Sequence, residues 1–306
     1  MRFQLGVAAL PRICKRLGYV KKSEDAYFLI ADGSGGLRGG LADGVGGLSV
    51  DFSIDSGIYA ESLIRYSFKR ASKKTKLPLS PTEIIKSSWK KISEEKTQGA
   101  STLLVFVIDK NGQLNASNIG DSSLMVLRGG LITAVAPTSQ LHFDRPAQLG
   151  FLDEKNRDFF QTPSSVVELD PPVILREGDL VFCMSDGITD NLDSGDIEKI
   201  VTSRPFSAAP ELALAIVESA QARALDTTRD SPFSLVAKQN DVAWSYGGRV
   251  DDITCLAVRV LGEGGEGPEG GVELPATLSP AQLCSKLLPQ NAAEEKSSKH
   301  AIKKSR

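Results

Sequence analysis

The chain contains very little histidine and cysteine. Its 306 residues include two histidines, His142 and His300, and four cysteines. No two cysteines have the Cys-x-x-Cys spacing of a zinc or redox site, and the two histidines do not stand at helical spacing. Four scattered cysteines also argue against a disulfide framework. Any chemistry must therefore depend mostly on carboxylates.

An excess of one charge and a long apolar run are also missing. The 36 Lys and Arg residues are balanced by 38 Asp and Glu residues, so the formal net charge is −2. This balance argues against nucleic acid or an anionic membrane as the main partner. The longest apolar run in a strand-like segment, residues 103–108, is far shorter than the ~20 residues that cross a bilayer. We therefore expect no nucleic-acid partner and no membrane span.

The first 23 residues are basic and contain no acidic residue. This composition resembles an organelle-targeting peptide. The alternative is a first strand, residues 3–10, followed by a basic turn after Pro11. We favour the strand, because the first acidic motif begins at Glu24 and leaves no room for a removable leader. The compartment therefore stays open between an organelle and the cytoplasm.

Hydrophobic periodicity predicts β-structure and helices in the first hundred residues. A β-hairpin is expected over residues 26–43, with turn chemistry at 32–36. A helix is expected over 54–74, with its apolar face made of Ile58, Leu63, Ile64 and Phe68. A second helix begins at Ser80, which can form a capping box with Glu83.

The pattern then changes to alternating strands. The sequence predicts four successive strands, at 101–109, 113–119, 122–127 and 131–135. After them we expect an irregular stretch at 137–172, a buried strand at 179–184, helices at 196–201, 210–225 and after 232, and a last strand at 253–260. Beyond Gly262 the composition becomes rich in glycine, then in lysine and glutamate. We interpret 1–262 as one domain and 263–306 as a disordered tail.

Acidic residues stand at the ends of five predicted strands: Glu24 with Asp25, Asp43, Asp121, Asp186, and Asp251 with Asp252. Taken singly, each is explained by turn chemistry, because Asp-Gly and Gly-Asp pairs are common where a strand stops. Antiparallel strands, however, can bring several strand ends to one edge of a sheet. The acidic residues would then converge in one cleft.

A cleft with four or five carboxylates is stable only if a cation neutralises their repulsion. Oxygen ligands without Cys or His favour hard ions such as Mg²⁺ or Mn²⁺. Two such ions about 3.5–4 Å apart can activate a bridging water and hold the oxygens of a phosphoryl group. Gly44, next to Asp43, would let a backbone carbonyl approach a metal closely.

The order of these motifs resembles that of the metal-dependent protein phosphatases of type 2C. The matching segments are EDAYF at 24–28, ADGVGG at 42–47, NIGDSS at 118–123, SDGITDNL at 185–192 and VDDIT at 250–254. They belong to a resemblance that extends from about residue 3 to 260. The ADGVGG variant, SQLHFDRPAQLG and SPFSLVAKQ resemble the mitochondrial and plastid branch of that family.

The resemblance implies an α+β fold, an αββα sandwich of two packed antiparallel β-sheets flanked by helices. It also implies two bound ions, Mg²⁺ or Mn²⁺. Asp43 would bridge both ions, and the Gly44 carbonyl would bind one of them. Asp186 and Asp251 would bind the other.

The same resemblance assigns outer positions of the site. Glu24 and Asp25 would act as catalytic residues by contacting metal-bound waters. Asp121 and Asp190 match positions that hold a third, weaker metal in some members. Asp252 occupies a position filled by Asn or Asp in the family, so the ligand role falls to its neighbour.

Three departures from the family pattern concern the substrate side of the site. Many members have a histidine after the bridging Asp-Gly, proposed as the general acid, where this chain has Val45. The phosphate-binding arginine is replaced by Val20, with Lys21 and Lys22 beside it. The segment after the Gly-Asp motif also lacks the usual pattern. A metal-bound water could protonate the leaving group; His142 is a second candidate, although an ordinary hydrogen-bonded loop histidine is the simpler interpretation.

The sequence therefore predicts a protein serine/threonine phosphatase that hydrolyses phosphoserine and phosphothreonine with metal-activated water. Its partners would be phosphorylated protein substrates, and we expect a monomer. By resemblance the compartment is a mitochondrion or plastid, or the cytoplasm if there is no leader. The alternative is a catalytically weak, phosphatase-like protein that binds phosphorylated partners without turnover.

Overall fold

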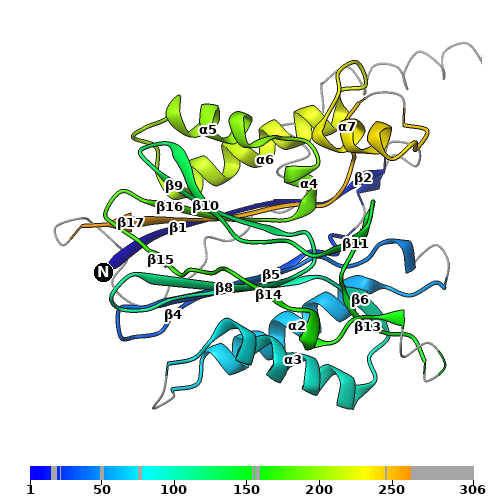
Figure 1. The fold of residues 1–306 in the computed structure, drawn as a ribbon, viewed down its shortest axis with the longest axis horizontal. Coiled ribbons are helices and arrows are strands. Elements are labelled where there is room, and N and C mark those ends of the chain that lie inside the picture. Colours follow the sequence, from blue (N-terminus) through cyan, green and yellow to red (C-terminus); the bar gives the residue numbers. More distant parts are fainter. Residues whose placement is uncertain are drawn as a thin grey trace, which may run out of the picture. The chain divides into compact units, whose positions relative to one another are not determined.

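Two antiparallel β-sheets packed face to face form the centre of the fold (Figure 1). The computed structural model describes residues 1–14, 19–20, 22–48, 52–74, 78–153, 155, 159–244 and 247–262. The first sheet has the order β1 (Arg2–Leu10), β17 (Ile253–Leu261), β16 (Leu180–Met184), β9 (Ser123–Arg128) and β10 (Leu131–Val135). The second has the order β14 (Val167–Glu168), β8 (Gln113–Ile119), β7 (Leu103–Ile108), β5 (Leu37–Ala42) and β4 (Ala26–Ala31), with β15 (Val173–Ile174) also paired to β8.

Helices cover the outer face of each sheet, which completes the predicted αββα sandwich (Figure 1). The second sheet is covered by α2 (Ser56–Ala71) and α3 (Pro81–Glu95), and the first by α5 (Ser194–Thr202), α6 (Ala209–Leu225) and α7 (Pro232–Gln239). The predicted capping box at the start of α3 is present, with Ser80 and Glu83 each bonded to the other's backbone N–H. None of the described helices has the length and apolar character that a membrane span needs.

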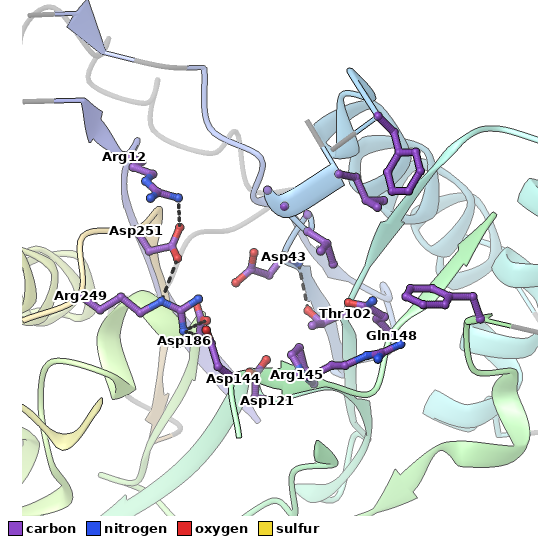
Figure 2. Close-up of a pocket in the computed structure, with 18 residues that line it drawn as sticks. Arg12, Asp43, Thr102, Asp121, Asp144, Arg145, Gln148, Asp186, Arg249 and Asp251 are labelled. Carbon is purple, nitrogen blue, oxygen red and sulfur yellow. Dashed lines mark hydrogen bonds and ion pairs between the residues drawn. The ribbon is translucent and has the colours of Figure 1, made fainter. Parts of the chain in front are cut away.

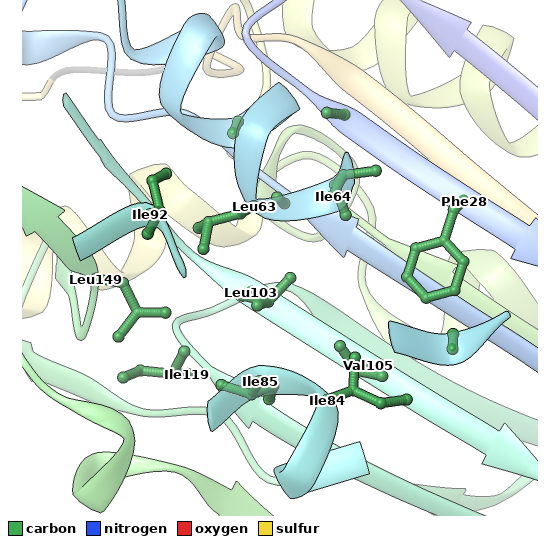
Figure 3. Close-up of a cluster of buried hydrophobic side chains, with 14 of the residues drawn as sticks. Phe28, Leu63, Ile64, Ile84, Ile85, Ile92, Leu103, Val105, Ile119 and Leu149 are labelled. Atoms are coloured by element: carbon green, nitrogen blue, oxygen red, sulfur yellow. The ribbon is translucent and has the colours of Figure 1, made fainter. Parts of the chain in front are cut away.

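Strand β7 shows why the chain forms two cores. Its six residues are all buried, and successive side chains point to opposite faces of the sheet. Leu103 and Val105 pack against α2 and α3 in one cluster (Figure 3). Leu104 and Phe106 pack between the two sheets in the other. A Cβ on Gly39 would lie 2.4 Å from the Phe106 ring, so only glycine leaves room for this aromatic side chain.

The apolar face predicted for the first helix was partly wrong. Leu63 and Ile64 are buried, but Ile58 and Phe68 are 52 % and 43 % exposed. The buried face of α2 is instead completed by small residues, among them Ala60. Small side chains let the helix approach the sheet closely, and a count of large apolar residues does not register them.

The stretch predicted as irregular, 137–172, contains several short elements. They are β11 (Gln140–His142), β12 (Arg145–Pro146), β13 (Leu149–Phe151), a 3-10 helix at Pro163–Ser165, and β14. β11 pairs with β12, and β13 pairs with β6 (Gly99–Ser101). Helix α4 (Asp186–Thr189) was also missed. Elements of two to four residues are too short to show a period.

The remaining paired segments are β2 (Ile13–Cys14) and β3 (Tyr19–Val20). The other predicted strands and helices are confirmed, with ends that differ by a few residues. The predicted tail, 263–306, lies outside the described residues. Its disorder and the domain boundary at 262 stay predictions.

Candidate active site

Two of the predicted acidic positions meet at one edge of the second sheet. Asp25 immediately precedes β4, and Asp43 immediately follows β5. These strands are antiparallel, and Ala26 lies opposite Ala42. The strand register therefore places the two aspartates side by side, although they are far apart in the sequence.

The first sheet brings its acidic residues to the same end of the sandwich, where its strands begin or finish. Met184 of β16 lies opposite Ser123 on one side and Cys255 on the other. The segments next to these strand ends carry Asp121, Asp186 and Asp251. Figure 2 shows these three aspartates and Asp43 around one cavity.

This acidic cavity has a volume of about 430 Å³. Its charged lining consists of Asp43, Asp121, Asp144, Asp186, Asp251, Arg12, Arg145 and Arg249. Its apolar lining includes Val45, Leu48, Phe52 and Phe159. Of the predicted site residues, Gly44 also lines the cavity, whereas Glu24, Asp25 and Asp190 are not part of its lining.

Burial raises the pKa of the carboxyl groups in and behind the cavity. The pKa values of Asp25 and Asp43 lie well above their ordinary value, first because of burial and then because of neighbouring carboxylates. The same two causes raise the pKa of Asp121 to about 7 and that of Asp251 to about 6. Buried carboxyl groups that lie this close together bind protons or metal cations strongly.

The hydrogen bonds around Asp252 separate its role from that of Asp251. Asp252 Oδ1 accepts from the Arg12 backbone N–H at 2.6 Å, and its Oδ2 accepts from the Glu24 backbone N–H at 2.7 Å. Both oxygens therefore hold other segments in place. Asp251, in contrast, lines the cavity. This arrangement supports Asp251 as the ligand of the pair.

The donor set fits hard divalent cations. Asp25 Oδ1 and Asp186 Oδ1 are buried and accept no hydrogen bond, so each has an unused lone pair. The other oxygen of Asp25 accepts from Thr254 Oγ1 at 2.6 Å. A Cβ on Gly44 would lie 2.9 Å from the Glu24 carbonyl oxygen, so this position requires glycine. Oxygen-only donors of this kind are those that Mg²⁺ and Mn²⁺ prefer.

The described part of the chain holds no group of three or more His, Cys, Asp or Glu side chains arranged as a ready metal site. The guanidinium of Arg249 stands among the carboxylates. It lies 2.9 Å from Asp190 Oδ2 and 3.6 Å from Asp186 Oδ2. The assignment of metal ligands therefore stays a prediction.

The sequence interpretation missed four charged residues of this cavity: Arg12, Arg145, Arg249 and Asp144. Arg12 belongs to the basic N-terminal segment, in which no spacing sets it apart from the other cations. Asp144 and Arg145 lie in the SQLHFDRPAQLG segment, where an Asp-Arg pair in a stretch predicted to be irregular was the available signal. Arg249 lies two residues before Asp251, close enough to that motif to be included with it.

Among the described residues, no histidine lines the cavity. Val45, at the position of the family histidine, packs against a small apolar cluster that includes Leu48 and Phe160. His142 is exposed on β11 and does not line the cavity. His142 is therefore better explained as a surface residue.

Comparison with known proteins is consistent with this geometry. The chain is 30 % identical over 252 residues to "Protein phosphatase PTC7 homolog fig" of Drosophila pseudoobscura pseudoobscura, covering 78 % of this chain and 72 % of that protein. It is 32 % identical over 246 residues to "Probable protein phosphatase 2C 55" of Arabidopsis thaliana, covering 80 % and 49 %. The X-ray structure of the photosystem II phosphatase PBCP superposes with a TM-score of 0.72 at 24 % identity, covering 84 % of this chain and 98 % of that one. No family model matches the chain.

The curated relatives that the chain matches over these sheets and this cavity are named as protein phosphatases. The chain belongs to the protein phosphatase 2C family, and PTC7 homologues are among its relatives. The predicted resemblance is thereby confirmed. The chain spans about half the length of the plant relatives that it matches.

Proposed function

We propose that this chain hydrolyses phosphoserine and phosphothreonine in protein substrates. The observation that carries the proposal is the convergence of buried aspartates from both sheets on one cavity that also contains arginines. Carboxylates hold hard cations, and arginines bind phosphate. A cavity with both is suited to a phosphoryl group next to a metal centre.

Four groups of this chain would hold two Mg²⁺ or Mn²⁺ ions. Asp43 would bridge both ions, the Gly44 carbonyl would bind one, and Asp186 and Asp251 would bind the other. Such ions supply an activated water nucleophile and stabilise the charge on a phosphoryl group. Because the folded chain raises the pKa of Asp43 and Asp251, these ions would bind with release of protons.

Glu24 and Asp25 would orient metal-bound water from behind the lining of the cavity. Asp25 is held by the Thr254 hydroxyl at 2.6 Å, which fixes the direction of its second oxygen. Glu24 is buried, with a relative exposure of 6 %. Rigid carboxylates at this depth can hold a water in one orientation without moving themselves.

Arg12 is the residue best placed to anchor the substrate phosphate. It lines the cavity, and its side chain is 51 % exposed, with NH1 3.9 Å from Asp251 Oδ1. Lys22, one of the cations next to Val20, is engaged elsewhere by an ion pair of 2.6 Å with Glu61. Lys21 lies outside the described residues. Arg12 therefore takes over the phosphate contact in this proposal.

The proposal is tested by phosphatase assays on a phosphothreonine peptide with Mn²⁺, with Mg²⁺ and with a chelator. We expect metal-dependent turnover that falls by several orders of magnitude in Asp186→Asn. The matched control is Glu94→Gln, which removes an exposed carboxylate that pairs with Lys91 on α3. Turnover close to wild type in Asp186→Asn would contradict the proposal.

The second candidate is a protein that binds phosphorylated partners without turnover. The observation that favours it is Val45, an apolar residue that lines the cavity at the position where the family pattern has a histidine proposed as the general acid. The same assay separates the two candidates. A folded protein that binds Mn²⁺ and the phosphopeptide but shows no turnover would establish the binding function instead.

We further propose a mitochondrial or plastid location and a monomeric state. The location is supported by the likeness to PTC7 homologues. Fractionation of cells that express the protein would test the compartment, and sedimentation would test the monomer. Accumulation in the cytoplasm would contradict the first proposal, and a dimer would contradict the second.

A further inference from the structure

Arg249 makes more contacts with carboxylates than the other arginines of the cavity. Its NH1 lies 2.8 Å from Asp144 Oδ1, 2.9 Å from Asp190 Oδ2 and 3.6 Å from Asp186 Oδ2. Its Nε lies 3.6 Å from Asp251 Oδ2. Figure 2 shows the guanidinium directed between Asp251 and Asp186 at the wall of the cavity. One positive charge is thus shared by four aspartates from three separate segments.

The rest of the residue is held firmly in this position. The Arg249 backbone N–H donates to Asn191 Oδ1 at 3.0 Å, and its carbonyl accepts from Asn191 Nδ2 at 2.8 Å. Asn191 is fully buried. The guanidinium carbon lies 4.8 Å from the centre of the Phe233 ring, a cation–π distance. The backbone and the side chain of Arg249 are therefore both held in one position by the folded chain.

Asp144 fixes the guanidinium from the outer side. It lies in the turn between β11 and β12 with a φ of 56°, in the left-handed region. The preceding residue, Phe143, packs on Phe233 with ring centres 5.3 Å apart. The turn therefore contacts both the cation and the ring beneath it. It ties Arg249 in place between the turn and the acidic residues.

We infer that Arg249 is the resident cation beside Asp190 and excludes a third divalent ion from the position between Asp121 and Asp190. The inference rests on the proposed function, because it concerns the number of ions that the same site holds. A Mg²⁺ ion there would need oxygen ligands at about 2.0–2.1 Å. The guanidinium already contacts Asp190 Oδ2 at 2.9 Å, and its positive charge would repel a divalent ion beside it. The third, weaker ion predicted for Asp121 and Asp190 is therefore absent in this chain.

The test counts Mn²⁺ ions bound to the full chain, by electron paramagnetic resonance of free Mn²⁺ during titration. Arg249→Gln is expected to bind one ion more than the wild-type protein. Removal of a unit charge about 4 Å away is expected to strengthen the binding of that ion at least about tenfold. A double variant with Asp190→Asn as well should return to the wild-type count.

The matched control is Arg145→Gln, which removes the same charge from the same cavity. Arg145 lies 4.4 Å from the centre of the Phe159 ring, and no carboxylate of the described residues forms an ion pair with its guanidinium. Its Mn²⁺ count should equal that of the wild-type protein. An equal gain in both variants would show that net charge, not the position of Arg249, sets the count, and would overturn the inference.

Circular dichroism would show whether Arg249→Gln folds. If it does not, a second variant tests the same inference. Asp144→Asn removes the shortest ion pair of Arg249 from a side chain that is 46 % exposed. It should admit the additional ion at a higher Mn²⁺ concentration. An unchanged count in the folded variants overturns the inference. Failure of the proposed function would be a separate result. It would appear as an absence of turnover in the wild-type protein, whatever the numbers of Mn²⁺ ions that the wild-type protein and the variants bind.

Discussion

The free energy of unfolding of the metal-free protein should fall as the pH rises from 5 to 8. The reason is the set of buried carboxyl groups at the cavity, whose pKa values are raised in the folded state. Each of them binds its proton more tightly in the folded than in the unfolded chain. Protonation therefore stabilises the fold, and this stabilisation is complete only below the unfolded pKa.

The magnitude follows from the two groups with defined values. The pKa of Asp251 rises from 3.8 to about 6, and that of Asp121 rises from 3.8 to about 7. For Asp251 alone the shift corresponds to about 3 kcal/mol of unfolding free energy. This contribution is lost as the pH rises through about 6, and that of Asp121 is lost through about 7. Between pH 5 and pH 8 Asp251 loses only about 1.4 kcal/mol of this contribution, because the rest is already lost below pH 5. A loss of about 1.4 kcal/mol lowers the melting temperature by roughly 3–6 °C, and the loss at Asp121 adds to it.

Calorimetric melts with a chelator, at pH 5 and at pH 8, measure this difference. With excess Mn²⁺ the slope should disappear or reverse, because cations bind the ionised carboxylates and replace the protons. Calorimetric titration in two buffers of different ionisation enthalpy should detect protons released on Mn²⁺ binding. Asp251→Asn should flatten the chelator profile near pH 6. A chelated protein whose stability is constant or rises between pH 5 and pH 8 would refute the reasoning.

Three substitutions test other parts of the structure. Arg12→Gln should raise the KM for a phosphopeptide at least about tenfold with a smaller change in kcat, as steady-state kinetics would show, because the residue acts in phosphate binding. Gly187→Ala should lower the melting temperature, because the new Cβ would lie 2.0 Å from the Asp252 carbonyl oxygen. Arg128→Gln should cost about 3 kcal/mol in urea unfolding, because it breaks two hydrogen bonds, of 2.9 and 2.7 Å, to the buried carboxylate of Asp179. Unchanged KM, melting temperature or unfolding midpoint, respectively, would contradict each expectation.

Much of the fold could be predicted because its elements are long and locally consistent. The hairpin of β4 and β5 has the predicted bounds, and the Ser80–Glu83 capping box marks the start of α3. Short elements such as β11, β12 and α4 could not be predicted, since two to four residues carry no period. The exposed positions of Ile58 and Phe68 show the same limit, because the sheet under α2 selects small residues that a hydrophobicity count overlooks.

The sequence by itself determined which acidic residues stand at strand ends and that they need a cation. Hard-ion chemistry follows from residue type, and strand ends follow from local patterns, so neither requires the packed structure. Only the tertiary structure decided where the arginines lie. Arg12 and Asp251 are far apart in the sequence, but their side chains lie 3.9 Å apart. The guanidinium of Arg249 stands among four aspartates. A long, flexible side chain takes its position from the segments packed around it, and no local spacing in the sequence records that position.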